Sequence, residues 1–169
     1  MKDVLIVFFM SIGAIAIGLL LFFFGPQGFH TAIVGYDREG AIPFTVIEEG
    51  VFAIGVNQPS NYRIKNQAEL IELWGLVFGN EGPKLPVVSF ETHDVLAIFD
   101  GSHVRGGFDI SVTKISDENG KRVVHILRSL PGDACRTSPE VTSPFQILTV
   151  KQSTLPLESR EMVITSICD

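Results

Sequence analysis

The side chains that could carry out chemistry are few in this chain and far apart along it. Its four histidines are His30, His93, His103 and His125. His93, His103 and Asp100 could form a metal site because imidazole and carboxylate groups bind zinc, but histidines of the surface and of loops are the simpler interpretation. Ser102 and His103 are adjacent, whereas a nucleophile and its base normally meet through the fold, and no third group that would orient the histidine is identifiable.

The other candidate groups also have simpler explanations. Asp94, Asp100 and Asp109 are more typical of turns and strand edges than of an acid/base pair. Cys135 and His125 could be drawn as a thiol–imidazole pair, but a disulfide explains Cys135 more simply. The sequence contains no nucleophile-elbow, zinc-helix, P-loop or dinucleotide-binding motif. We therefore predict a protein that is not an enzyme and has no cofactor and no metal.

The most distinctive polar segment is Asp100–Phe108, DGSHVRGGF, which joins an apolar run to an alternating one. Gly101 would let the chain leave the first strand, and Gly106 and Gly107 would permit positive φ or a close backbone approach. Phe108 would begin the next strand and shape the loop. A plain hairpin loop is the alternative. The candidate partner-binding residues are Ser102, His103, Val104, Arg105, Gly106 and Gly107.

One helix is predicted among the elements that position this loop. Asn66 is a good N-cap, Glu69 completes a capping-box-like pattern, and Gly79 ends the helix. The apolar residues at helical spacing are Leu70, Ile71, Trp74, Val77 and Phe78.

The rest of the chain reads as short strands. Val95–Phe99 is continuously apolar and is expected to be buried on both faces, whereas Phe108–Thr113 alternates like a half-buried strand. Asp117–Gly120 ends in Asn-Gly, a strong hairpin signal. The other predicted strands are Phe44–Ile47, Val51–Ile54 after the turn EEG, Val87–Phe90, Val123–Leu127, Phe145–Val150 and Met162–Ile167. Together they predict an α+β fold, mostly antiparallel and sandwich-like, with one helix.

A long apolar run precedes this domain. Val4–Phe24 contains no charge and has about the roughly 20 residues that a helix needs to cross a bilayer. A cleaved signal peptide is the alternative, but the run continues beyond the small residues Ala14 and Ala16. Positive-inside logic places the domain outside the cytoplasm, because Lys2 precedes the run and the next basic residue is Arg38. We expect an anchor over residues 1–24, a juxtamembrane linker over 25–41 and a soluble domain over 42–169.

Charge and cysteine content narrow the partners. The formal net charge is −6 and the sequence pI is about 5.2, with no basic cluster, which argues against binding to nucleic acid. The two cysteines are Cys135 and Cys168. In an exported domain they would form a disulfide, and in a cytoplasmic one they would stay free thiols. The expected location is the cell membrane, with a single span and an extracytoplasmic domain.

The ordered motifs resemble a family. The segments VLAIFDGSHVRGGFDISV, LPGDAC and SPFQILTV, with FTVIEEG upstream, look like the C-terminal domain of the PrcB family of protease complex subunits. The resemblance covers about residues 42 to 168. The family loop usually reads Pro-Thr-Gly-Gly-Tyr, where this chain has Val104–Phe108. This loop is also similar to the one that chagasin-type inhibitors insert into proteases.

The resemblance implies a non-catalytic domain of the bacterial envelope that associates with a protease, and that stabilises or modulates it. Two functions therefore stay open from the sequence. The first is an anchored protein-binding module that acts on a protease or another envelope protein through the loop. The second is an envelope domain that binds a small ligand or serves structural assembly.

Overall fold

The computed structural model describes residues 40–168. The predicted anchor over 1–24, His30 and nearly all of the predicted linker lie outside these residues. Within residues 40–168, no helix is both long enough and apolar enough to cross a membrane.

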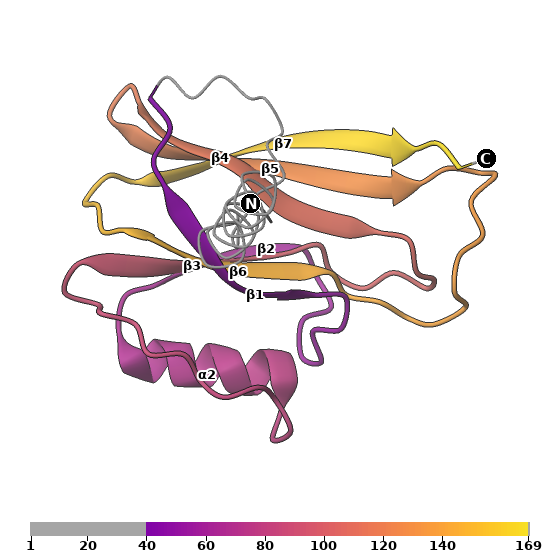
Figure 1. The fold of residues 1–169 in the computed structure, drawn as a ribbon, viewed down its shortest axis with the longest axis horizontal. Coiled ribbons are helices and arrows are strands. Elements are labelled where there is room, and N and C mark those ends of the chain that lie inside the picture. The colour runs from indigo at the N-terminus through magenta and orange to yellow at the C-terminus, as the bar shows by residue number, and fades with distance from the viewer. Residues whose placement is uncertain (1–39, 169) are drawn as a thin grey trace, which may run out of the picture. The chain divides into compact units, whose positions relative to one another are not determined.

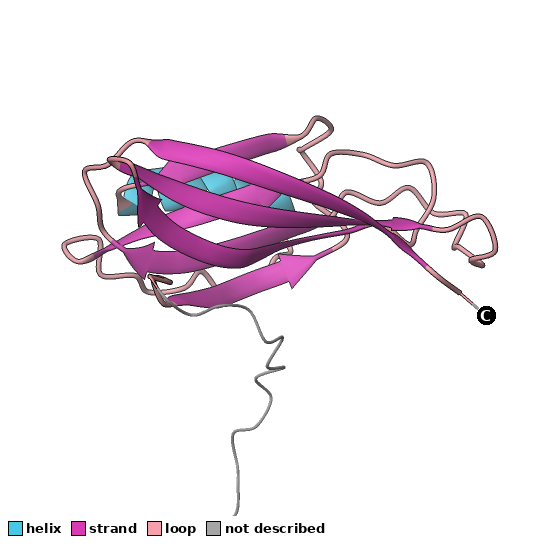
Figure 2. Ribbon diagram, turned by 90° about the horizontal axis from the view of Figure 1, so that it is seen from above, coloured by secondary structure: helices cyan, strands magenta, loops and turns pink. Residues whose placement is uncertain are grey.

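Within residues 40–168, two β-sheets and one helix form the fold (Figure 1). The first sheet has the strand order β1-β6-β3-β2, and the second has the order β4-β5-β7. Helix α2 covers the outer face of the first sheet, and Figure 2 shows the twisted second sheet from above with the helix on its far side. The elements are β1 (Phe44–Gly50), β2 (Ser60–Ile64), α2 (Gln67–Phe78), β3 (His93–Phe99), β4 (Asp109–Glu118), β5 (Lys121–Pro131), β6 (Phe145–Lys151) and β7 (Leu157–Ser166).

Strand β3 separates two hydrophobic cores. Val95, Ala97 and Phe99 pack with the helix residues Leu70 and Val77, whereas Leu96 and Ile98 pack against the second sheet. Alternate side chains of a strand point to opposite faces, so one strand supplies both cores. The prediction that Val95–Phe99 is buried on both faces is confirmed.

The predicted ends of the helix are confirmed: Asn66 caps its start and Gly79 its end. The Asn66 side chain accepts the backbone N–H of Glu69 at 2.9 Å, and the Glu69 carboxylate accepts the N–H of Lys65 at 2.8 Å. At the other end, the Gly79 N–H bonds the Gly75 carbonyl and Gly79 has a φ of 63°. Ile71 does not belong to the buried stripe, since it is 54% exposed. Leu73 fills that place in the core.

The predicted hairpin turn is also confirmed. Asn119 and Gly120 have φ values of 50° and 76°, the positive values that a tight two-residue turn requires. The turn joins β4 to β5, which pair antiparallel with one register shift between Val112 and Lys114.

Several predicted strands were wrong. The EEG residues belong to β1 rather than to a turn, and the chain after them forms only an isolated bridge, Phe52 with Ser143. β6 ends its pairing with β1 at Phe145, so Val51–Ile54 has no strand to join. Val87–Phe90 is irregular. Strand β2 was not predicted, because its sequence SNYRI has little apolar pattern.

The strand pairing is mostly antiparallel, as predicted, but the second sheet contains one parallel pair, which the sequence did not predict. β7 runs parallel to β5 along its whole length, from Leu157 opposite Arg122 to Ser166 opposite Pro131. The chain reaches β7 from β6, which lies in the other sheet. Its direction is therefore set by this crossover and not by a hairpin.

A disulfide joins Cys135 and Cys168, with Cα atoms 5.1 Å apart, which confirms the pairing expected for an exported domain. Cys135 lies in the loop that follows β5, and Cys168 follows β7. The bond therefore ties the connection between the two sheets to the end of the chain's last strand.

Replacing both cysteines, Cys135→Ser with Cys168→Ser, should lower the free energy of unfolding by about 3–4 kcal/mol, because the closed loop spans 33 residues. Urea unfolding of the full chain in detergent, followed by the fluorescence of its single tryptophan, Trp74, measures this. Reductant should destabilise the wild type and leave the double variant unchanged. Equal stability of the two proteins without reductant would contradict the prediction.

Candidate functional site

The segment Asp100–Phe108 crosses from one sheet to the other. β3 belongs to the first sheet and β4 to the second, and the two strands do not pair with each other. The alternative of a plain hairpin loop is therefore wrong. The loop is a crossover whose two ends are fixed by different layers of the fold.

A buried carboxylate holds the base of this crossover. Asp100 is 6% exposed and lies 2.6 Å from His103 Nε2 and 2.8 Å from Arg128 Nη1. Arg128 comes from β5, so this ion pair links the end of β3 to the second sheet. The His103 ring also stacks on Phe108, with centroids 3.7 Å apart and planes 4° from parallel. Both ends of the loop are thereby joined through His103.

Neighbouring segments hold the middle of the loop. His103 and Thr142 exchange two backbone hydrogen bonds of 2.8 and 2.9 Å, and the Thr142 hydroxyl donates to the Arg105 carbonyl at 3.0 Å. The Gly106 N–H donates to the Ser138 carbonyl at 2.9 Å. Ser102 bonds Asn57 through both its backbone and its hydroxyl. The loop is thus a fixed shape rather than a free tip.

Two glycines are needed for this shape. Gly107 has a φ of 92°, and a Cβ placed there would lie 3.0 Å from side-chain atoms of Pro131 and Thr137. Gly101 has a φ of 81°, and a Cβ there would lie 2.9 Å from Pro59. Gly106 does not have positive φ; it is buried where its backbone meets Ser138.

Exposed apolar side chains surround the fixed loop. Val104 is 84% exposed at its tip, beside the exposed Arg105, which has no ion pair among residues 40–168. Phe52, Ile54 and Val141 are also largely exposed. These three residues and Ser102 line one shallow hollow of about 220 Å³. We call the five residues Phe52, Ile54, Val104, Arg105 and Val141 the crossover face.

The sequence singled out the loop but missed most of its surroundings. Phe52 and Ile54 were assigned to a strand, and Val141 stood in a polar stretch without a pattern. The isolated bridges Phe52–Ser143 and His103–Thr142 bring these segments together. A possible signal was the presence of large apolar residues in stretches that carry neither helical nor strand periodicity.

The structure does not assemble the metal site considered from the sequence. His93 begins β3 and His103 follows its end, so the strand's length separates them. The His93 ring bonds the Thr92 hydroxyl at 2.8 Å. Residues 40–168 hold no group of three or more His, Cys, Asp or Glu side chains suited to a metal ion.

Of the other chemical pairings considered, only Asp100 and Asp109 interact: burial raises the pKa of Asp109, and the negative charges of Glu49 and Asp100 raise it further. Ser102 bonds Asn57 while His103 bonds Asp100, so the two neighbours do not act on each other. Asp94 and Asp100 lie at opposite ends of β3, and Asp94 is paired with Arg63 at 2.6 Å. Cys135 belongs to the disulfide.

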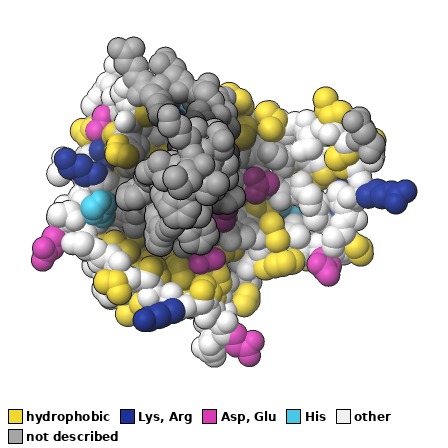
Figure 3. Space-filling model, in the orientation of Figure 1, with side chains coloured by type: hydrophobic (Ala, Val, Ile, Leu, Met, Phe, Trp, Pro, Cys, Tyr) yellow, Lys and Arg dark blue, Asp and Glu magenta, His cyan; other side chains and the backbone are white. Residues whose placement is uncertain are grey.

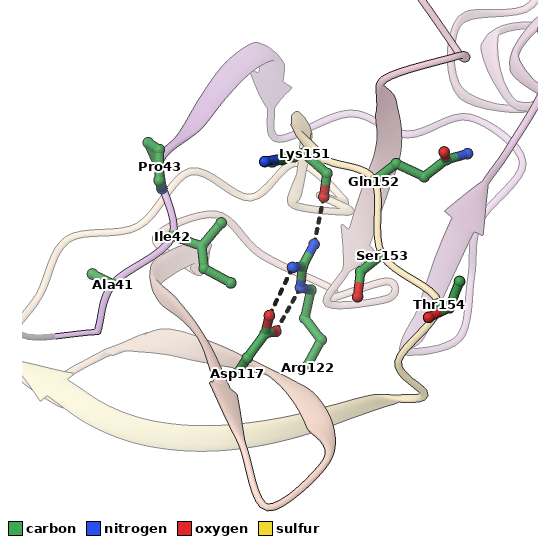
Figure 4. A pocket seen from close by; sticks show the side chains of 9 residues that line it. All are labelled: Ala41, Ile42, Pro43, Asp117, Arg122, Lys151, Gln152, Ser153 and Thr154. Carbon is green, nitrogen blue, oxygen red and sulfur yellow. Dashed lines mark hydrogen bonds and ion pairs between the residues drawn. The ribbon is translucent and has the colours of Figure 1, made fainter.

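A second hollow, of about 600 Å³, lies where the hairpin turn approaches the end of β6 (Figure 4). Its buried charge is Arg122, whose Nε and Nη2 donate to the Asp117 carboxylate at 2.8 and 3.0 Å. Nη1 donates to the Lys151 carbonyl. The Arg122 guanidinium is therefore fully paired with groups of the domain itself, and it links the hairpin to β6. The hollow is lined by Ala41, Ile42, Pro43, Asp117, Arg122, Lys151, Gln152, Ser153 and Thr154.

Comparisons with protein-family models, with curated proteins and with solved structures found no match. The resemblance to the PrcB family rests on the sequence motifs alone.

Arg122 also makes the stability of the domain depend on pH. Its hydrogen bonds lower the pKa of Asp117 below the usual value. The pair therefore stabilises the fold above about pH 4, where the unfolded carboxyl is ionised, and this contribution is lost as the pH falls through the lowered pKa. Asp117→Asn should cost about 1 kcal/mol at pH 7, since the carboxylate is partly exposed.

Urea unfolding at a series of pH values measures this effect. The difference between Asp117→Asn and wild type should shrink as the pH falls below about 4 and vanish once the pH is below the lowered pKa of Asp117. Glu140→Gln removes the same charge at an exposed position and should show no such dependence. A difference that persists unchanged at low pH would contradict the role given to the ion pair.

Proposed function

We propose that the protein is a membrane-anchored, non-catalytic binding protein of the cell envelope, which captures another protein through its crossover face. The observation that carries the proposal is the exposure of Val104 and Arg105 on a fixed loop, beside the exposed Phe52, Ile54 and Val141. Contiguous apolar side chains at a surface are typical of protein-binding sites.

The composition of the face suits such a site. Aromatic residues and arginine are enriched at the energetic centres of interfaces, and the face contains Phe52 and Arg105. The hydrogen bonds of Thr142 and Ser138 already order the loop in the free protein. Binding a partner therefore costs little further conformational entropy in the loop. Arg105 would pair a carboxylate or stack on an aromatic ring of the partner.

The surface agrees with a protein rather than a nucleic acid as partner. Figure 3 shows hydrophobic side chains at the surface among scattered acidic and basic ones, with no extended basic area on the described part of the side of the molecule in view. The net charge of −6 points the same way.

The resemblance to the PrcB family makes an envelope protease the first partner to consider, which the protein would stabilise or modulate. Val104 and Arg105 replace the Pro-Thr pair of that family, so the contact would rely on an aliphatic side chain and a guanidinium. The disulfide supports the envelope location, because such bonds persist in oxidising compartments.

A second function is favoured by a different hollow. A narrow apolar slot of about 220 Å³ opens between the two sheets at β2 and β7. Tyr62, Ile98 and Leu157 are among its lining residues. An envelope domain that binds a small apolar ligand would use this slot, and a retained lipid-like molecule in the purified protein would favour this function over protein capture.

The proposed topology predicts that alkaline phosphatase fused after Asp169 is active in cells, because that enzyme needs an oxidising compartment for its own disulfides. Deleting Val4–Phe24 from the fusion should abolish this activity and is the matched control. An inactive phosphatase together with an active cytoplasmic reporter at the same position would overturn the proposed location.

The proposed docking face predicts site-specific crosslinking. A photoreactive residue at position 104 of the full chain, in its native membrane, should form one dominant protein adduct. The same residue at position 84, also exposed, should not form it. Arg105→Ala should weaken capture by about 5–30-fold, corresponding to about 1–2 kcal/mol, whereas Lys84→Ala should leave capture unchanged. Identical adducts from positions 104 and 84 would rule out the crossover face.

A further inference from the structure

Strand β7 has a free edge along its entire length. It pairs with β5 over ten residues in an unbroken register, and no other strand within residues 40–168 pairs with its outer side. Its side chains are exposed on both faces of the sheet. Glu158 is half-buried, and the other residues of the strand are all exposed. β7 is therefore a long strand at the margin of the fold, with unpaired backbone groups.

The other three edges are protected in ways that β7 is not. β1 has a register shift between Val46 and Glu48, and β2 has only five residues. β4 has a register shift of its own, and Ala41 forms a bridge with its residue Ser116. Short length, bulges and covering segments are the usual devices that prevent pairing between sheets. β7 has none of these three features, so its edge is open to pairing with another strand.

The two halves of β7 differ in chemistry. In the first half, Glu158, Arg160 and Glu161 are engaged in ion pairs with neighbouring strands of the same sheet. The second half, Met162–Ser166, has no charge. Met162, Val163 and Ile164 are 53%, 58% and 43% exposed. The apolar part of the edge is thus the part left without a partner.

We propose that β7 pairs antiparallel with β7 of a second copy of this chain, with Val163 on the two-fold axis. The two three-stranded sheets then become one continuous sheet across the dimer. Met162 lies opposite Ile164 of the second copy, and Val163 lies opposite itself. Apolar residues face apolar residues, and the unpaired backbone groups of both edges are satisfied.

Charge disfavours the registers centred on Arg160 and Glu161, and the pairing of apolar residues favours Val163 over Met162 and Ile164 as the centre, since centring on Ile164 would set Val163 against Thr165. A pairing centred on Glu161 would place two carboxylates opposite each other, and one centred on Arg160 would place two guanidinium groups opposite each other. A pairing centred on Met162 would set Glu161 against Val163. Centring on Val163 brings Glu161 opposite Thr165 and keeps like charges apart.

The dimer goes beyond the proposed function and does not depend on it. The crossover face contains no residue of β7, so each copy would keep its own face. Two faces on one assembly would give a bivalent binder, whose second contact benefits from the effective concentration set by the first.

A cysteine at the two-fold axis tests the pairing directly. The chain has only two cysteines and both are in the native disulfide, so Val163→Cys introduces the single free thiol. Opposite residues of an antiparallel pair have Cα atoms roughly 4.5–5.5 Å apart, within the range that a disulfide spans. Under mild oxidation, most of the full-length Val163→Cys protein in membranes or detergent should run as a covalent dimer.

Arg160→Cys is the matched control on the same strand. In the proposed register its two copies are roughly 20 Å apart, so they should crosslink much less. Equal crosslinking by the two variants would overturn the register, and the absence of a Val163→Cys dimer would overturn the proposal.

Val163→Lys provides an independent test without added chemistry. Two ammonium groups would meet on the axis, so sedimentation of the full chain in detergent should shift from dimer to monomer, while an unchanged far-UV circular dichroism spectrum shows that the variant stays folded. Val141→Lys, on the crossover face, should stay dimeric while losing partner capture, which separates this proposal from the proposed function. A wild-type protein that sediments as a monomer at all concentrations would refute the dimer.

Discussion

The fold depends on covering strand β3 on both of its faces. Val95, Ala97 and Phe99 must be shielded on one side and Leu96 and Ile98 on the other, because each of these side chains is almost fully removed from water. One sheet cannot do this alone. Helix α2 closes the first face and the second sheet closes the other, so the three-layer arrangement follows from the sequence of one strand.

The same constraint produces the candidate site. Since β3 lies in the first sheet and the next strand must begin in the second, the chain has to cross between layers after Phe99. The crossing places a carboxylate, Asp100, in the interior, where a buried charge is tolerated only when it is paired. Arg128 and His103 supply that pairing. A layer change required by packing thus creates a fixed loop, and the side chains at its tip, Val104 and Arg105, are left exposed.

Sheet edges explain where the molecule is open to association. The first sheet ends in a bulged strand and a short one, and β4 is covered in part by the chain that leads into β1. Only β7, of the strands described, ends a sheet with a regular, uncharged segment. The disulfide ties the segment just after this strand to the loop that follows β5.

The sequence by itself determined the features that act within a few residues. Asn66 and Gly79 set the limits of α2 through bonds to nearby backbone groups, Asn119 and Gly120 made the hairpin turn, and the unbroken apolar run marked β3 as buried. The fold class, β-rich with one helix, followed from these. The loop glycines were visible because their geometry is local.

Only the tertiary structure decided which distant segments meet. Phe52 and Val141 join the loop through single bridges, and β7 runs parallel to β5 because of a crossover from the other sheet. No local pattern specifies such contacts, since their free energy comes from surfaces far apart in the chain. The sequence could therefore mark the loop at Ser102–Gly107 as unusual, but its apolar surroundings and the free edge of β7 appear only when long-range packing has chosen the neighbours of each strand.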